Sequence, residues 1–116
     1  MTEIELRDLL SKVQKLKSET KNLEIKAAHV GCPSRLYDTL SSFSNQDDGG
    51  IILFGVDEQN DFEEVGVYDA QDLQKHVVEQ CNQMEPVIRP LFSVLSKDDL
   101  VFVTAEIPGL DMTHRP

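Results

Sequence analysis

Three carboxylates and one lysine are spaced so that they could act on a phosphate group. Glu19, Glu24 and Lys26 lie within eight residues, and Asp57 follows a second apolar segment. The chain around Glu24 alternates apolar and polar side chains, which predicts a strand with Glu24 and Lys26 on one polar face. If the two segments are neighbouring strands, the three carboxylates could meet and bind Mg²⁺ or Mn²⁺, which polarise phosphodiesters. Lys26 could then contact the phosphate.

The same residues also have a simpler interpretation. Glu24 and Lys26 could form an exposed ion pair on one strand face, and Glu19 could be a charge near a helix end. Pairs of this kind are common on protein surfaces and weak. Spacing alone therefore leaves both a metal site and an ordinary charged surface open.

The glycines around the second apolar segment do not form a nucleotide-binding loop. Gly49-Gly50 precedes the apolar segment Ile51–Val56, whereas a phosphate-binding loop lies between a strand and a helix. No Gly-Lys-Ser/Thr follows, so the lysine and hydroxyl that hold phosphate and magnesium are missing. The glycines indicate a turn that passes close to a neighbouring segment.

Net charge argues against a simple basic nucleic-acid module. The 116 residues, enough for one domain, contain 11 Lys+Arg and 21 Asp+Glu, a formal net charge of −10. Phosphate binding draws its affinity from Lys and Arg. Residues 1–40 contain seven basic and six acidic residues, whereas residues 41–116 contain four basic and fifteen acidic residues. A nucleic-acid site is therefore expected to be local and to lie in the first third of the chain.

Nothing in the sequence indicates a membrane or secreted protein. The longest apolar run, Ile51–Phe54, is far shorter than the roughly 18 residues that a spanning helix needs. The N-terminus lacks the basic and apolar regions of a secretory signal. Cys32 and Cys81 have no metal-like spacing, and reduced thiols are expected. We expect a cytoplasmic protein with no membrane partner.

The elements that must position the carboxylates follow from periodicity and turn residues. Thr2 and Glu5 predict a capping box, and helical spacing of leucines predicts an amphipathic helix over 3–17. Alternation and apolar runs predict the strands. The further elements are a strand at 23–27, a helix from Pro33 to near Asn45, strands at 51–56 and 65–67, a helix capped by Asp69 and ended by Pro86, and a hairpin of 92–95 and 100–107. This order predicts an α+β sandwich in which helices cover a small mixed sheet.

The chain resembles the AlbA-type domain of the Schlafen group, which occurs in many bacterial DNA-binding regulators. The resemblance covers roughly residues 18–110 and rests on Glu-x-Lys, Phe-x-Asn, Gly-Gly and Gly-Val-Asp patterns. The matching segments are Glu19–Lys26, Ser42–Gly50, Ile51–Asp57, Val65–Asp69 and Pro86–Pro90. The resemblance implies an Alba-like two-layer sandwich with an extra N-terminal helix at 1–17.

The resemblance also implies a set of functional residues. Animal relatives cleave RNA with three carboxylates, and Glu19, Glu24 and Asp57 occupy the matching positions here, which would hold Mg²⁺ or Mn²⁺. Bacterial relatives imply binding of DNA or RNA. The residues expected to contact nucleic acid are Lys21, Lys26, Arg35 and Asn45. Relatives usually continue beyond this length, so residues 111–116 are expected to be the loop-like tail of a truncated domain.

Three functions follow in order of preference. The first is a nucleic-acid-binding domain of a bacterial transcriptional regulator. The second is an interaction module that forms a homodimer, with the apolar stripe of the helix at 3–17 facing a second copy. The third is a metal-dependent ribonuclease that uses the three carboxylates.

Overall fold

The first element of the chain is a helix that the sequence caps at its own N-terminus. In the computed structural model, which describes residues 1–111, helix α1 spans Glu3–Leu16. The Thr2 hydroxyl accepts a hydrogen bond from the Glu5 backbone N–H (3.1 Å), and the Glu5 carboxylate accepts one from the Thr2 N–H (2.9 Å). The predicted capping box is therefore confirmed, and it satisfies two backbone donors that the helix leaves free. The tail predicted at 111–116 lies outside the described residues, apart from Asp111.

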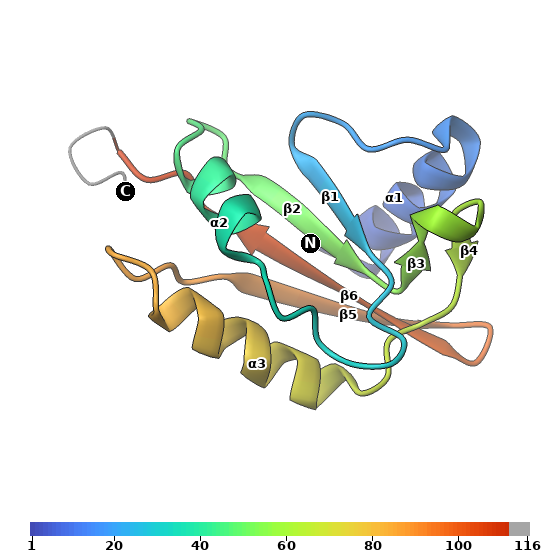
Figure 1. Cartoon of the computed structure of the whole chain (residues 1–116). Coiled ribbons are helices and arrows are strands. Elements are labelled where there is room, and N and C mark those ends of the chain that lie inside the picture. Colours follow the sequence, from blue (N-terminus) through green and yellow to red (C-terminus); the bar gives the residue numbers. More distant parts are fainter. Residues whose placement is uncertain (112–116) are drawn as a thin grey trace.

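The remaining elements form a mixed sheet with helices on both faces (Figure 1). The elements after α1 are β1 (Leu23–Lys26), α2 (Tyr37–Ser44), β2 (Gly50–Phe54), β3 (Val56–Asp57), the 3₁₀ turn η1 (Glu58–Asn60), β4 (Glu63–Glu64), α3 (Ala70–Asn82), β5 (Leu91–Lys97) and β6 (Leu100–Ile107). The four-stranded sheet has the order β1-β2-β6-β5, and β3 pairs with β4 separately.

The pairing of β1 with β2 decides where the predicted site residues lie. The two strands are parallel, with Glu24 opposite Ile52 and Lys26 opposite Phe54. β6 runs antiparallel to both β2 and β5 and so lies inside the sheet. The expectation that the strands at 23–27 and 51–56 are neighbours is therefore confirmed.

Each face of the sheet has its own core. On one face, Leu6, Leu10 and Val13 of α1 are buried against a cluster that includes Leu53 and Phe102. On the other face, α2 and α3 pack on the other side chains of β2 and β6. The predicted α+β sandwich with an additional N-terminal helix is thus confirmed.

The expected role of α1 in a dimer is wrong. The apolar stripe of the helix was expected to face a second copy, but Leu6, Leu10 and Val13 are at most 2% exposed inside this chain. Without α1, the face of the sheet that it covers would lie open to water. Packing of the stripe on this face therefore buries apolar surface of the helix and of the sheet within one chain.

The start of the second helix differs from the sequence prediction. The second helix starts at Tyr37 and not at Pro33, and residues 31–36 form a loop with Leu36 as the N-cap position. The Gln80 side chain holds this loop, because its amide donates to the Pro33 carbonyl (2.7 Å) and its oxygen accepts from the Leu36 N–H (3.0 Å). A tertiary contact therefore replaces the helical turn that proline would favour.

The apolar segment at 51–56 is not one strand. Gly55 has a φ of +117°, and its position against the Phe102 ring leaves no room for a side chain. The chain changes direction there, and Val56 begins β3, which pairs with Glu63–Glu64. The strand predicted at 65–67 is loop, because the Val65 and Gly66 N–H groups both donate to the Gly55 carbonyl (2.9 Å each).

Candidate functional site

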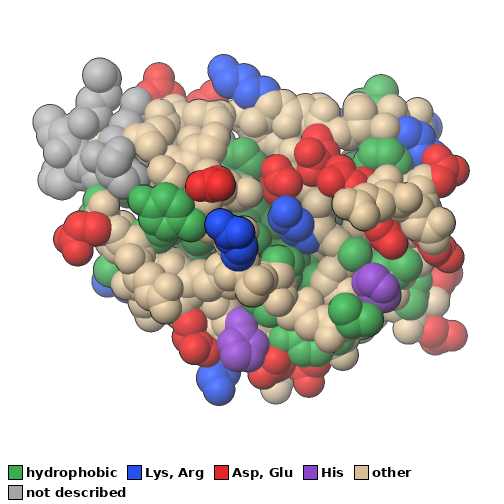
Figure 2. All heavy atoms as spheres, viewed as in Figure 1, with side chains coloured by type: hydrophobic (Ala, Val, Ile, Leu, Met, Phe, Trp, Pro, Cys, Tyr) green, Lys and Arg blue, Asp and Glu red, His purple; other side chains and the backbone are tan. Residues whose placement is uncertain are grey.

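Acidic side chains gather where β1 meets the segment after β3. On the face shown in Figure 2, Asp and Glu side chains lie together over this region, with basic side chains beside them. The group consists of Glu19, Glu24 and Glu58, whose charges influence one another, and Lys26. The sequence prediction had placed Asp57 in this group instead of its neighbour Glu58.

Glu19 is positioned by the turn that joins α1 to β1. The helix ends with Lys17 in the left-handed conformation (φ 50°), whose N–H donates to the Val13 carbonyl. The Glu19 carboxylate then accepts a hydrogen bond from the Ile25 N–H in β1, 2.7 Å away. Glu19 therefore contacts the outer edge of β1, in the strand that carries Glu24.

Glu24 and Lys26 lie on the same face of β1, as the alternating pattern predicts. The Lys26 ammonium is 3.4 Å from the Glu24 carboxylate, and both side chains are about one-third exposed (33% and 28%). The simple interpretation, an ion pair on a strand face, therefore describes what these two residues do in this conformation. It also leaves Lys26 partly neutralised.

The carboxylate of Asp57 has a local structural role. It accepts a hydrogen bond from the Gln59 N–H (3.2 Å) and so caps the 3₁₀ turn η1. The following residue, Glu58, has a raised pKa. Burial is the largest cause, followed by the charges of Glu19 and Glu24 and a hydrogen bond with Glu19, while Lys26 lowers it. Like charges crowd here, and that arrangement favours a proton or a cation.

The donor set suits Mg²⁺ or Mn²⁺, which prefer carboxylate oxygens. Among residues 1–111, however, no three His, Cys, Asp or Glu side chains are arranged to hold a metal ion. Glu19 is engaged with a backbone N–H and Asp57 with a turn, so metal binding requires both to reorient. The three predicted ligands lie in one region but do not form a ready coordination site.

Two of the predicted nucleic-acid residues line one polar hollow. Lys21 and Asn45 border a cavity of about 340 Å³ with Asn22, Gln46, Asp47 and Asp48. Lys21 is exposed, and the Asn45 amide donates to the Ser41 carbonyl (2.9 Å), which fixes it at the end of α2. The structure thus brings together a cation and amide side chains from segments 24 residues apart.

Arg35 lies in a different hollow. It borders a smaller cavity of about 170 Å³ with Tyr37, Gln80 and Met84, among others. Lys26 lies in the carboxylate group described above, and Lys21 and Arg35 are in no ion pair within the part of the chain that the structure describes. The four predicted contact residues therefore divide among three places.

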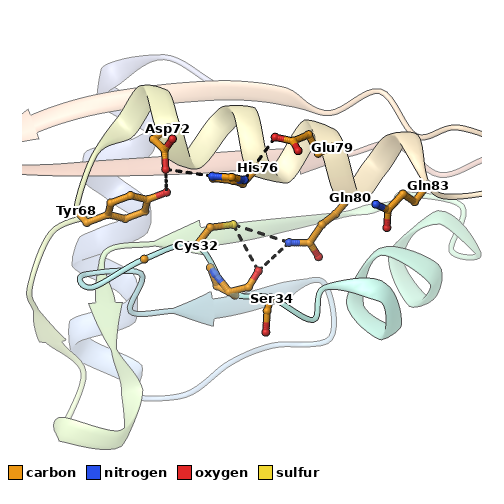
Figure 3. A pocket seen from close by; sticks show the side chains of 10 residues that line it. Cys32, Ser34, Tyr68, Asp72, His76, Glu79, Gln80 and Gln83 are labelled. Carbon is orange, nitrogen blue, oxygen red and sulfur yellow. Dashed lines mark hydrogen bonds and ion pairs between the residues drawn. The ribbon is translucent and has the colours of Figure 1, made fainter.

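A third hollow contains reactive side chains that the sequence pattern did not assign to a site. Its cavity of about 420 Å³ lies between α3 and the loop at 31–34 (Figure 3). His76 lies between two carboxylates of α3, with Nε2 3.3 Å from Asp72 and Nδ1 3.4 Å from Glu79. The Tyr68 hydroxyl donates to Asp72 (2.5 Å), and the Gln80 amide lies 3.8 Å from the Cys32 sulfur.

The potential in this hollow is negative. Burial and the charges of Asp72 and Glu79 raise the pKa of the Cys32 thiol. The pKa of Tyr68 is also raised, by burial first and then by its hydrogen bond to Asp72. Both groups stay protonated at neutral pH, so Cys32 is not an activated nucleophile. Helical spacing of Asp72, His76 and Glu79 could have placed them on one face, but no sequence pattern brings Cys32 to them.

Comparison with known proteins agrees with the fold. Residues 16–114 match the family described as Schlafen, AlbA_2. The chain is similar in structure to the N-terminal domain of a protein from Nitrosomonas europaea. That protein is described as related to the ATP-dependent DNA helicase RecG. Its TM-score is 0.77 at 26% identity, over 94% of this chain and 76% of that one.

A more distant structure shares the fold alone. The DIP2311 protein from Corynebacterium diphtheriae superposes with a TM-score of 0.55 at 11% identity. The match covers 92% of this chain but 27% of that protein. No curated protein matches the chain.

Proposed function

Because the chain belongs to the Schlafen, AlbA_2 family, we propose that it is a nucleic-acid-binding domain of a bacterial transcriptional regulator that acts in the cytoplasm. The family and the helicase-related neighbour together indicate a nucleic-acid-related domain. The regulatory role and the binding of DNA or RNA as a target are our proposal and are not given by these two comparisons. Within residues 1–111, no helix is long and apolar enough to cross a bilayer.

The observation that carries the proposal is the polar hollow of Lys21 and Asn45. Phosphate contacts come from lysine and from amide side chains such as asparagine, and both types converge here from separate segments. Lys21 is exposed and in no ion pair among the described residues, so it can pair with a phosphate without breaking an existing bridge. Lys26 differs, since a phosphate must compete there with Glu24 at 3.4 Å.

The acidic residues around the hollow limit the expected affinity. Asp47 and Asp48 line it together with the lysine, and the whole chain has a net charge of −10. Repulsion between these carboxylates and phosphates offsets part of the attraction to Lys21. We therefore expect weak binding that falls steeply with salt concentration.

Fluorescence anisotropy with labelled single-stranded RNA, single-stranded DNA and duplex DNA tests this proposal. We expect binding at about 20 mM salt that is largely lost at about 150 mM salt. The Lys21→Ala substitution should weaken binding about fivefold and lower the salt slope by about one. Lys75→Ala removes the same charge from an exposed position on α3 and is the matched control.

Each result has a defined meaning for the proposed function. Loss of affinity in Lys21→Ala with retention in Lys75→Ala supports the hollow as the contact surface. Equal losses of affinity in both variants would mean that binding depends on net charge and not on this surface. No binding of any of the three nucleic acids at low salt would reject the proposal.

We also propose a second candidate function, a ribonuclease that depends on Mg²⁺ or Mn²⁺. The observation that favours it is the mutual repulsion of Glu19, Glu24 and Glu58, which a divalent cation would relieve. Glu19, Glu24 and Asp57 would hold the metal, which supplies charge neutralisation at a phosphodiester. Lys26, released from Glu24, would bind the same phosphate.

Substitutions in the carboxylate group separate this activity from simple binding. We expect RNA cleavage with Mn²⁺ that EDTA stops and that Glu24→Gln lowers by about 100-fold or more. Comparison of Asp57→Asn with Glu58→Gln identifies the third ligand, since these neighbours have different contacts. Titration calorimetry with Mn²⁺ alone should show the same ranking, and Glu79→Gln is the control outside the group. Cleavage that persists in Glu24→Gln would exclude this site.

A further inference from the structure

Two buried side-chain oxygens beside the polar hollow of Lys21 have no hydrogen-bond partner. They are Oδ1 of Asn22 and Oε1 of Gln46, and both residues border this hollow. Among residues 1–111, one other buried side-chain atom lacks a partner, the Thr104 hydroxyl in β6. A buried acceptor without a donor costs free energy, so such atoms are rare in folded proteins. Two of them at one hollow indicate a ligand that donates hydrogen bonds there.

Asn22 also borders a second hollow that adjoins the first. This cavity of about 420 Å³, which we call the Arg89 hollow, shares Asn22 and Asp48 with the polar hollow. Its other wall residues include Arg89, Leu91 and Ile51. Because the two cavities have wall residues in common, they lie along one groove, with a lysine in one part and an arginine in the other.

The topology of the sheet places these two cations at the same end of it. β1 and β5 run in the same direction, since β1 is parallel to β2 and both β2 and β5 are antiparallel to β6. Lys21 lies two residues before β1 and Arg89 two residues before β5, so both lie beyond the end where these strands begin (Figure 1). Three strand spacings of about 4.8 Å separate β1 from β5, which gives the groove a length of about 14 Å. A few nucleotides of an extended strand can follow it.

The charges in the groove leave both cations available to phosphates. Lys21 and Arg89 are exposed, and neither is in an ion pair within the described part of the chain. Of the carboxylates in the Arg89 hollow, Glu106 lies 2.9 Å from the N-terminal ammonium of Met1 and is therefore neutralised. Asp48 borders both hollows and so lies between the two cations. Phosphates are therefore favoured at the two ends of the groove, and a sugar or a base in the middle.

The middle of the groove combines apolar surface with a carboxamide. Ile51 is partly exposed, and Leu91 is 63% exposed. Apolar side chains favour contact with the flat face of a base. The Asn22 carboxamide has an acceptor beside a donor, which matches the donor and acceptor that lie side by side on the Watson–Crick edge of every base. In a duplex both the face and this edge are already occupied, so the middle of the groove fits an unpaired base.

A metal ion is the other ligand that carboxamide oxygens could bind, and the surrounding residues disfavour it. Lys21 borders the same hollow, and its charge repels a cation. Within residues 1–111, no three His, Cys, Asp or Glu side chains are arranged to hold a metal ion. Hydrogen-bond donors of an organic ligand therefore suit the two oxygens better.

We propose that this groove binds single-stranded nucleic acid, with phosphates at Lys21 and Arg89 and an unpaired base on the Asn22 carboxamide between them. The inference rests on the nucleic-acid-binding function proposed above and narrows its ligand to an unpaired strand. The edge of the base donates to Oδ1 of Asn22 and so supplies the hydrogen bond that this buried oxygen lacks. A duplex does not present this edge and binds through its phosphates alone.

Competition between unlabelled nucleic acids for the protein tests the kind of strand. The labelled probe is a single DNA strand of about 12 nucleotides, followed by anisotropy at low salt. The competitors are the same strand, its annealed duplex, a single RNA strand of the same sequence, and an abasic strand with the same number of phosphates. We expect both single strands to compete about tenfold better than the duplex and about fivefold better than the abasic strand.

Substitution of Asn22 separates a contact with the base from a role in folding. Asn22→Leu removes the unpartnered oxygen with little change in size. It should weaken single-strand binding about fivefold and abolish the preference over the abasic strand, while the midpoint of urea unfolding stays the same or rises. Asn82→Leu makes the same change at an exposed position at the end of α3 and should bind like the wild type.

Substitution of Arg89 tests the second part of the groove. Arg89→Ala should weaken single-strand binding about fivefold and lower the salt slope by about 0.7, the value for one phosphate of a single strand. Arg7→Ala is the matched control, because Arg7 is exposed on α1 and borders neither hollow. An equal loss of affinity in Arg7→Ala would mean that net charge, and not the groove, determines binding.

The outcomes separate this inference from the function on which it rests. No binding of any of these nucleic acids would reject both. Binding that Lys21→Ala weakens, but that Asn22→Leu and Arg89→Ala leave unchanged, would support the proposed function and overturn the groove. Equal competition by duplex and single strand, or by abasic and base-bearing strands, would also overturn it. These two comparisons use the wild-type protein, so they decide the question even if a variant does not fold.

Discussion

At the scale of single residues, the two neighbours Asp57 and Glu58 divide roles that the sequence assigned to one of them. Asp57 caps the turn η1, while the pKa of Glu58 responds to Glu19 and Glu24. A carboxylate that binds its own backbone is conformationally fixed, whereas Glu58 is exposed and has a longer side chain. The residue that is freer to move toward a cation is therefore Glu58.

The raised pKa of Glu58 predicts how its removal changes stability with pH. The folded state binds the Glu58 proton more tightly than the unfolded state, so the ionised group destabilises the fold above its folded pKa. This destabilisation disappears as the pH falls below the ordinary value of 4.5. Glu58→Gln should therefore raise the free energy of unfolding at pH 7 by about 0.5 kcal/mol, a small value because the side chain is exposed.

Urea unfolding at pH 7 and at about pH 4 measures the effect. The gain from Glu58→Gln should shrink at the lower pH, where the wild-type carboxyl is largely protonated. Asp99→Asn is the control, since it removes an exposed carboxylate outside this group. An equal gain at both pH values would mean that the repulsion with Glu19 and Glu24 is not its cause.

Sequence spacing placed Glu24 and Lys26 together, but it did not indicate that Glu58 lies beside Glu19 and Glu24. Alternation along β1 was enough to place Glu24 and Lys26 on one face, and the parallel pairing of β1 with β2 agrees with it. The position of residues 57 and 58 depends on the sharp change of direction at Gly55, which packs against the Phe102 ring of β6. No local pattern contains that contact.

At the scale of elements, local sequence determines where helix α1 begins, and tertiary contacts determine where it packs. Its start is fixed by the capping box of Thr2 and Glu5, and its position is fixed by apolar residues buried on the sheet. The first effect is encoded within four residues and was predictable from sequence. The second depends on which sheet face lies open, and for this reason the stripe of α1 was assigned to the wrong partner.

The capping box predicts a measurable contribution of Thr2. Thr2→Ala removes the hydroxyl that accepts from the Glu5 N–H and should lower the free energy of unfolding by about 1 kcal/mol in urea. Ser11→Ala, at an exposed position inside the same helix, should be neutral or slightly stabilising. Similar losses in both variants would show that general changes in α1, and not its cap, are responsible.

Elements with strong periodicity agreed with the structure, and elements set by tertiary contacts did not. The helix at 70–82, its Asp69 cap and the hairpin of β5 and β6 were predictable from spacing and turn residues. The late start of α2 depends on Gln80, which is 47 residues beyond Pro33 and holds its carbonyl. A local sequence pattern does not include a contact with a residue so distant in sequence.

At the scale of the whole molecule, the proposed nucleic-acid hollow lies at one edge of the main sheet. Lys21 and Asn45 lie near the start of β1, at the opposite edge of the sheet from β5. Nucleic acid that binds at this hollow alone therefore does not need to contact β5.

The order of strands in the sheet has a consequence for how the protein is made. β6, which lies between β2 and β5, is synthesised after all the other strands described. Until residues 100–107 leave the ribosome, β2 lacks its partner on one side and β5 lacks the strand it pairs with. Helices α1, α2 and α3 can form earlier, but both cores remain open because each contains side chains of β6. Folding is thus expected to wait for β6, and a nascent chain stalled before Leu100 should be degraded rapidly by added protease.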